Sequence, residues 1–172
     1  MSSYLNSLIA RIYYYKELAD KTFSQLEETD FHWFPNQESN SIAMIIRHIS
    51  GNMLSRFTDF LTTDGEKEWR HRDAEFEEGR ETKEELLASW EKGWKCFLLT
   101  LNSLKEEDLP ATINIRTEPL IVIDALNRQL AHYPYHIGQI IYIAKMLKNT
   151  NWKNLSIPRN ESNRFNERMK KN

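Results

Sequence analysis

The stretch LAHYPYHIGQ, residues Leu130–Gln139, follows a helical pattern and holds two histidines, His132 and His136, four positions apart. Residues at i and i+4 share one face of a helix, so these two imidazoles can bind the same metal ion. A third histidine, His48, lies far upstream in IIRHISGN. An imidazole from that second helix would complete a three-histidine site with one open coordination position, as catalytic zinc sites have.

Outward from this stretch, the spacing of apolar residues predicts four long amphipathic helices. We place them at residues 3–28, 41–61, 82–109 and 119–147. Residues 62–81 are too many for a tight turn, so we predict a crossover connection there. The sequence therefore predicts an all-α fold with four long helices. We expect one domain of 172 residues, with a core at 3–148 and a tail at 149–172.

Local signals mark several helix boundaries. The side chains of residues 39–41 offer oxygens that can cap the second helix, and residues 82–85, TKEE, match a capping box. Pro119 suits the first turn of the fourth helix. Inside that helix, Pro134 removes one backbone hydrogen bond and should kink the helix beside the histidines. Residues 111–117 alternate in polarity, which indicates a short extended strand.

The composition limits the classes of partner. Hydrophobic residues make up 40% of the chain and charged residues 28%, which is ordinary for a folded globular protein. The formal net charge is -2, so no overall field favours nucleic acid or an anionic membrane. No apolar run approaches the ~20 residues of a membrane span. One cysteine, Cys96, and a start without a signal-peptide pattern lead us to expect a cytoplasmic protein.

The second predicted helix carries polar residues on the same face as His48. This face is apolar at its start and then bears Asn52, Ser55 and Asp59 at helical spacing. A helix that only packs in a core would not place such side chains there, so we predict that these residues line a pocket.

The fourth predicted helix supplies further candidates around the histidine pair. Gln129 and Gln139 share the face of the pair and can orient the imidazoles through hydrogen bonds. Arg128, like Arg47 and Arg56, can meet a substrate carboxylate. Each arginine can equally form a salt bridge between helices or remain solvated.

Three neutral imidazoles would leave a divalent ion with its full charge, which lowers the pKa of a bound water or thiol. Zinc is the first expectation, although sites rich in imidazole also accept nickel, iron, cobalt or manganese. A histidine pair at i and i+4 is weak evidence by itself, because histidines also pack inside helical cores. A bundle without metal therefore stays open as an alternative.

The order of these histidines resembles that of the DinB/YfiT-like superfamily, and the resemblance covers nearly the whole chain. It rests on residues 41–53, 126–140 and 152–158, SIAMIIRHISGNM, LNRQLAHYPYHIGQI and WKNLSIP. The chain looks most like a branch whose biochemical function is not established. It departs from that branch at Asn160, because a glycine is expected after the sequence Ile-Pro-basic.

The resemblance implies an up-down-down-up bundle in which a divalent metal is bound by His48, His132 and His136. It also implies a homodimer. Characterised relatives include transferases that use low-molecular-weight thiols such as bacillithiol, and mycothiol-dependent isomerases. The leading hypothesis is therefore a metal-dependent enzyme that transfers a small thiol to a small-molecule electrophile.

Two other functions stay open. A metal-dependent hydrolase would need a general base near the open position, and Asp59, the acid on the His48 face, lies about three helical turns away. A stress-related protein could instead bind metal without turnover. A metal with an exchangeable ligand favours an enzyme, whereas a closed coordination shell favours a structural role.

Overall fold

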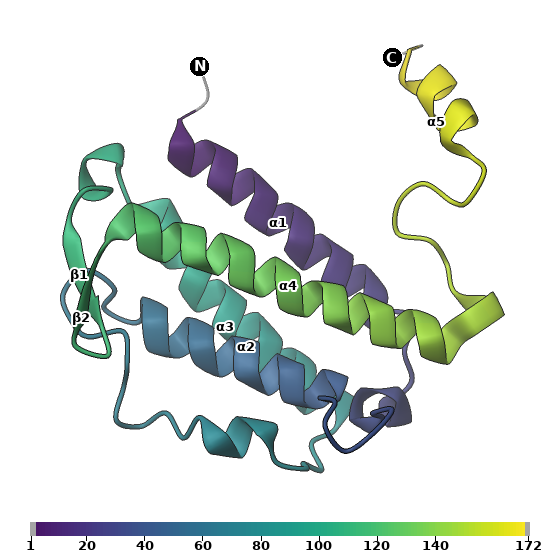
Figure 1. The fold of residues 1–172 in the computed structure, drawn as a ribbon, viewed down its shortest axis with the longest axis horizontal. Helices are drawn as coiled ribbons and strands as arrows, with labels where there is room; N and C mark the ends of the chain where they lie inside the picture. Colours follow the sequence, from purple (N-terminus) through teal and green to yellow (C-terminus); the bar gives the residue numbers. More distant parts are fainter. Residues whose placement is uncertain (1–2, 171–172) are drawn as a thin grey trace.

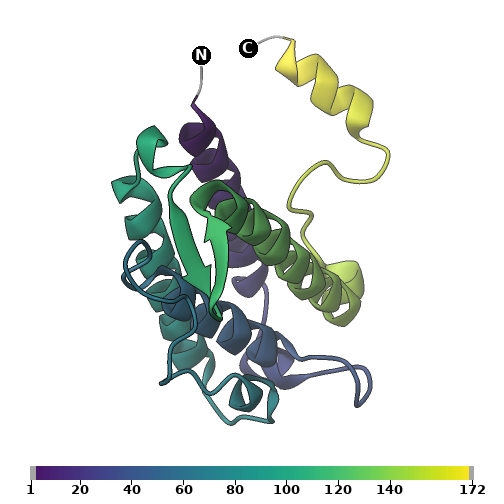
Figure 2. The same cartoon turned by 60° about the vertical axis from the view of Figure 1, so that its left-hand side comes forward.

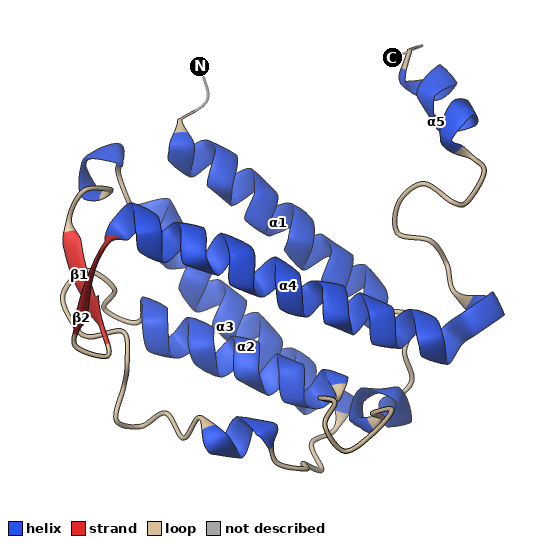
Figure 3. Cartoon of the chain, in the orientation of Figure 1, coloured by secondary structure: helices blue, strands red, loops and turns tan. Residues whose placement is uncertain are grey.

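The four predicted helices all form, and the computed structural model describes residues 3–170 (Figures 1 and 3). The long helices are α1 (Tyr4–Phe23), α2 (Ile42–Phe57), α3 (Lys83–Ser103) and α4 (Val122–Lys148). Two short strands precede α4, β1 (Thr112–Ile115) and β2 (Glu118–Ile121), and a short helix, α5 (Ser162–Met169), follows it. Single 3-10 turns lie at Glu28–His32, Asp73–Phe76, Glu106–Asp108 and Asn149–Asn151.

The bundle has the up-down-down-up topology. Helices α1 and α4 run in one direction, and α2 and α3 run in the other (Figures 1 and 2). The parallel pair α2 and α3 is joined by the crossover at residues 58–82, which contains the turn Asp73–Phe76. The closest packing is between α2 and α3 and between α1 and α4. The predicted fold class and the crossover are therefore confirmed.

Aromatic side chains fill the centre of the bundle. Trp90, Trp94 and Phe97 of α3 pack in series and are buried, and the buried ring of Tyr133 on α4 meets two of them. Tyr133 is the residue after His132, so the same packing that closes the core also fixes the turn of α4 that carries the histidines. Within residues 3–170, no helix combines the length and apolar character needed to cross a bilayer.

The predicted caps are confirmed. The side chain of Ser41 accepts a hydrogen bond from the backbone N–H of Met44 at the start of α2. Thr82 and Glu85 form the reciprocal capping box at the start of α3. These bonds satisfy backbone donors that have no partner inside the helix, so they define where each helix begins.

The fourth helix begins later than predicted. Pro119 lies in β2, opposite Asn114 of β1, and α4 starts only at Val122. The hairpin turns at Arg116 and Thr117, which have φ of 56° and 65°. Positive φ at both central residues is the geometry of the tight hairpin turn that suits the twist of paired strands. The single predicted strand at 111–117 was therefore half of a hairpin.

Three further boundaries differ from the predictions. Helix α1 ends at Phe23 and α2 at Phe57, each a few residues early, because short turns replace their last predicted turns. The tail contains α5, which the sequence did not predict, and every residue of α5 is exposed to solvent. Pro134 lies inside α4, which continues through it, and the kink stays a prediction.

Gly93 permits the closest approach between two helices. A Cβ atom at this position would lie 2.8 Å from Cα of Ser50 on α2, closer than real Cβ atoms come to backbone. We expect Gly93→Ala to lower the free energy of unfolding by about 1–3 kcal/mol, because α2 and α3 must move apart. Urea denaturation measures this loss.

Gly138 on α4 is the matched control, because a Cβ atom there would meet nothing within 4 Å. Gly138→Ala should leave the free energy of unfolding unchanged or raise it by up to about 1 kcal/mol. Equal losses in the two variants would contradict the role assigned to Gly93.

Candidate metal centre

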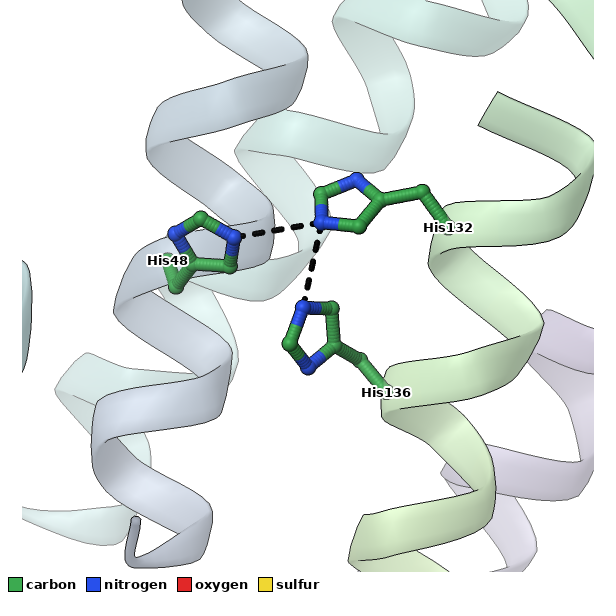
Figure 4. A group of neighbouring side chains, drawn as sticks. All are labelled: His48, His132 and His136. Atoms are coloured by element: carbon green, nitrogen blue, oxygen red, sulfur yellow. Dashed lines mark hydrogen bonds between the residues drawn. The ribbon is translucent and has the colours of Figure 1, made fainter. Parts of the chain in front are cut away.

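Three histidines from two helices converge on one point (Figure 4). His48 comes from α2, and His132 and His136 come from successive turns of α4. Nε2 of His132 lies 3.2 Å from Nε2 of His48 and 3.1 Å from Nε2 of His136. His48 and His136 are buried, and His132 is half-buried. The structure thus brings together the three residues that the sequence singled out.

The spacing of the three nitrogens fits a shared metal ion. Two ligands 2.0–2.1 Å from a tetrahedral zinc ion stand about 3.3 Å apart. The two measured separations are close to this value, and a candidate ligand atom from each histidine lies within 4.8 Å of the others. The donor set, three imidazoles and no thiolate, suits zinc as well as nickel, iron and other divalent transition metals.

The outer ring nitrogens are held by acceptors. Nδ1 of His48 lies 3.0 Å from Oε2 of Glu75, and Nδ1 of His136 lies 2.8 Å from Oε1 of Gln139. A carboxylate and an amide oxygen can only accept, so we assign the proton of each ring to Nδ1. The lone pair of each ring is then on Nε2, directed into the cluster. The contact between Gln139 and His136 is the orienting role predicted for Gln139.

Glu75 is the functional residue that sequence reasoning missed. It is buried in the short turn Asp73–Phe76 of the crossover. Arg70 binds it through two hydrogen bonds, Nε to Oε1 at 2.7 Å and Nη2 to Oε2 at 2.9 Å. A Cβ atom on Gly51 would lie 2.3 Å from Oε1 of Glu75, so this glycine makes room for the carboxylate above α2.

Burial and pairing act in opposite directions on the pKa of Glu75. Burial alone would raise its pKa, but the hydrogen bonds from His48 and Arg70 outweigh burial and hold the pKa below its usual value. Glu75 therefore stays ionised and orients His48 by a charge-assisted bond. The only sequence signal was a charged crossover too long for a plain loop, which does not single out one acid among many.

Two of the three histidines, His132 and His136, are kept neutral. Burial, together with the nearby His136, His48 and Arg128, lowers the pKa of His132 to about 3. Burial also lowers the pKa of His136, although its bond with Gln139 partly opposes this. Neutral imidazole is the form that binds metal ions, so the site is ready to accept a cation near neutral pH.

Each of the three imidazoles has an aromatic neighbour, which is Tyr133 in the case of His132. The ring centroid of Phe76, from the crossover, is 4.9 Å from that of His48. Tyr135 lies at the same centroid distance from His136. The crossover and α4 thus each supply an aromatic ring that packs against the cluster.

The pocket wall predicted on α2 stays a prediction, and its three residues have the following surroundings. Asn52 is buried, and its Oδ1 accepts a hydrogen bond of 3.0 Å from the hydroxyl of Tyr133. Ser55 donates to the carbonyl of Gly65 at 2.7 Å, so it anchors the crossover. Asp59 lies beyond the end of α2, is exposed and has a φ of 51°. The prediction that Asp59 shares the helical face of His48 was therefore wrong.

The remaining candidates differ in their surroundings. Gln129 is 2% exposed, and its Oε1 has no hydrogen-bond partner within residues 3–170. Arg128 is exposed, yet close enough to His132 to affect its pKa. Arg47 forms a salt bridge with Glu81, and Arg56 forms one with Glu66. Salt bridges were the alternative to substrate binding for these arginines.

We expect Glu75→Gln to weaken metal binding by about 10- to 100-fold, because the partners of metal-binding histidines tune their orientation and basicity. Gly51→Ala should act in the same direction by displacing the carboxylate. Titration against a competing chelator measures the affinity. Glu78→Gln is the matched control, since Glu78 is an exposed crossover acid with no ion pair among the described residues. Equal affinities in Glu75→Gln and the control would disprove the role of Glu75.

The pKa of His132 predicts an acid-sensitive stability of the metal-free protein. Below the usual pKa of 6.5 the unfolded chain binds a proton at this residue, whereas the folded chain does so only near pH 3. Stability should therefore fall as the pH drops from about 6.5 toward 3. Melting temperatures measured in chelator should fall less steeply for His132→Asn. Identical pH profiles for parent and variant would contradict this explanation.

Comparison with known proteins identifies the family of this chain. No curated protein matches the chain. A family model described as "Protein of unknown function (DUF1572)" matches residues 1–161, which include all four long helices and the three histidines. That family is part of the DinB/YfiT-like superfamily, as the resemblance in sequence implied. The chain therefore belongs to the DUF1572 family.

Proposed function

We propose that the chain binds one divalent transition metal through His48, His132 and His136 and uses it as a metal-dependent enzyme. The observation that carries this proposal is the convergence of three Nε2 atoms at 3.1–3.2 Å around His132. With the outer nitrogens of His48 and His136 engaged by acceptors, the lone pairs of these two rings are directed at Nε2 of His132. Nε2 of His132 can serve as the third donor to a shared cation when its proton is on Nδ1.

Residues around the three histidines would orient the metal ligands and shield them from water. Glu75 and Gln139 orient two of the ligands, and Phe76 and Tyr135 limit the access of water to them. Three neutral ligands leave one coordination position open in a tetrahedral site. A bound ion would supply a positive charge that lowers the pKa of a thiol or water and polarises a substrate carbonyl. Zinc is the first candidate, followed by nickel, iron and manganese.

Transfer of a small thiol, such as bacillithiol, to an electrophile is the reaction we favour. Characterised members of the superfamily carry out chemistry of this kind. A hydrolase would need a general base that can reach the open position. Glu75 is the one carboxylate among the described residues that contacts the triad, and it is already engaged by His48 and Arg70. Hydrolysis is therefore the second candidate.

Metal content is the first test. Tag-free protein should contain about one equivalent of a transition metal by plasma mass spectrometry, and His132→Ala should lose it. His71→Ala is the control, because His71 is an exposed histidine of the crossover that lies outside the cluster. Absence of metal in the parent, even after reconstitution with zinc, nickel, iron and manganese, would end the proposal.

Turnover is the second part of the test. Metal-loaded protein is incubated with low-molecular-weight thiols and electrophiles, and the thioether products are followed by mass spectrometry. A rate that depends on thiol concentration supports the transferase. Cleavage of esters or amides without thiol favours the hydrolase, and one bound metal without any turnover favours a non-catalytic metal-binding protein.

A further inference from the structure

An open groove runs along the C-terminal half of α4. Its volume is about 580 Å³, and it lies between α4 and the loop that precedes α2. Tyr135, Gly138, Tyr142 and Met146 form the α4 wall, and the tyrosines are 62% and 66% exposed. A Cβ atom on Gly138 would meet nothing within 4 Å, so the wall is bare at its middle. Large apolar side chains gathered in one groove are typical of an interaction site.

Helix α5 is the second unpartnered element. It has eight residues, none of them buried, and it presents Phe165 and Met169 one turn apart at 36% and 60% exposure. An isolated helix of this length is marginal in water, because helices below about 12–15 residues need tertiary packing. The apolar side of α5 therefore needs a surface to pack against.

The two elements have complementary charge. Glu38 lines the groove, and Glu78 lines an adjoining hollow of about 230 Å³ that shares Ser39 and Asn40 with it. Neither hollow is lined by lysine or arginine. Arg168 and Lys170 at the end of α5 are exposed. Within residues 3–170 these two acids and two bases form no ion pairs. The two carboxylates and the two basic groups can therefore pair with each other across an interface.

The placement of α5 determines which groove it can reach. The helix stands clear of the bundle on the side of α1, whereas the loop that precedes α2 lies on the other side of α4 (Figures 1 and 2). Lys153 is tied to Gln25 near the end of α1 by two hydrogen bonds, which directs the tail away from its own groove. From these contacts we propose that α5 docks into the α4 groove of a second copy of this chain.

The dimensions permit two copies to exchange the segment at residues 154–170, which we call the arm. The linker at residues 154–161 spans up to about 28 Å when extended. Eight helical residues measure about 12 Å, and the groove wall from Tyr135 to Met146 measures about 16 Å along α4. Phe165 and Met169 would lie against the exposed tyrosines, with Arg168 and Lys170 near Glu38 and Glu78.

The exchange has a direct bearing on the histidine cluster. Gln139, which holds His136, also lines the groove. The arm of the second copy would therefore cover the face of α4 behind that ligand. Each cluster would be shielded from solvent on this face by the other copy, so the dimer would complete the surroundings of the site.

Point variants in the full chain test the interface. Light scattering coupled to size exclusion should give a dimer for the parent at micromolar concentration. The double variant Phe165→Ala, Met169→Ala and the single variant Tyr142→Ala should each raise the dissociation constant at least tenfold. Leu99→Ala is the matched control, because Leu99 is an equally exposed residue of α3 outside the groove. A monomeric parent, or a dimer unaffected by both variants, would overturn the proposal.

Cross-linking distinguishes exchange from folding back within one chain. In a Cys96→Ser background, Phe165→Cys and Tyr142→Cys are placed on two differently tagged chains, which are mixed and oxidised. A disulfide between the two tags is expected. If the doubly substituted chain forms only an intramolecular disulfide, the arm docks in its own groove and the proposal fails. Both experiments are run with metal-free and metal-loaded protein, so their outcome does not depend on whether the cluster binds metal.

Discussion

The convergence of His48, His132 and His136 on one point is the constraint on which the rest of this structure depends. The packing of α2 against α4 holds the three rings in place. The buried ring of Tyr133 anchors the α4 turn next to His132. Its hydroxyl donates a hydrogen bond to Oδ1 of Asn52 on α2. The core thus holds the turn of α4 that carries His132 against α2.

The crossover contributes as much to the site as the helices do. Glu75 reaches His48 from a segment with little regular structure, and it can do so because Gly51 leaves space above α2. Ser55 and Arg56 meanwhile bind the carbonyl of Gly65 and fix the start of the same segment. The sequence analysis treated this crossover only as a connection between helices, but its Glu75 also orients the imidazole of His48.

Periodicity was sufficient to predict the helices, their order and the three histidines, because residues at i and i+4 have a fixed relation on a helix. The position of Gln139 beside His136 follows from the same rule. Glu75 has no such rule, because the path of an irregular segment depends on contacts distant in sequence. The prediction for Asp59 was wrong for the opposite reason. It applied helical spacing beyond Phe57, where α2 ends. The hairpin before α4 depended on two residues with positive φ that no strong turn signal marks.

Pro134 lies between the two histidines of α4, within one turn of each. Proline has no backbone N–H, so the carbonyl of Leu130 lacks its helical partner and this turn carries one hydrogen bond fewer than its neighbours. The separation of the two ligands is accordingly more compliant than in an ordinary helix. If the pair binds a metal, a small change in helical pitch would accommodate ions of different radius without repacking the core. Discrimination among such ions would then rest on ligand chemistry and cellular supply rather than on a rigid spacing.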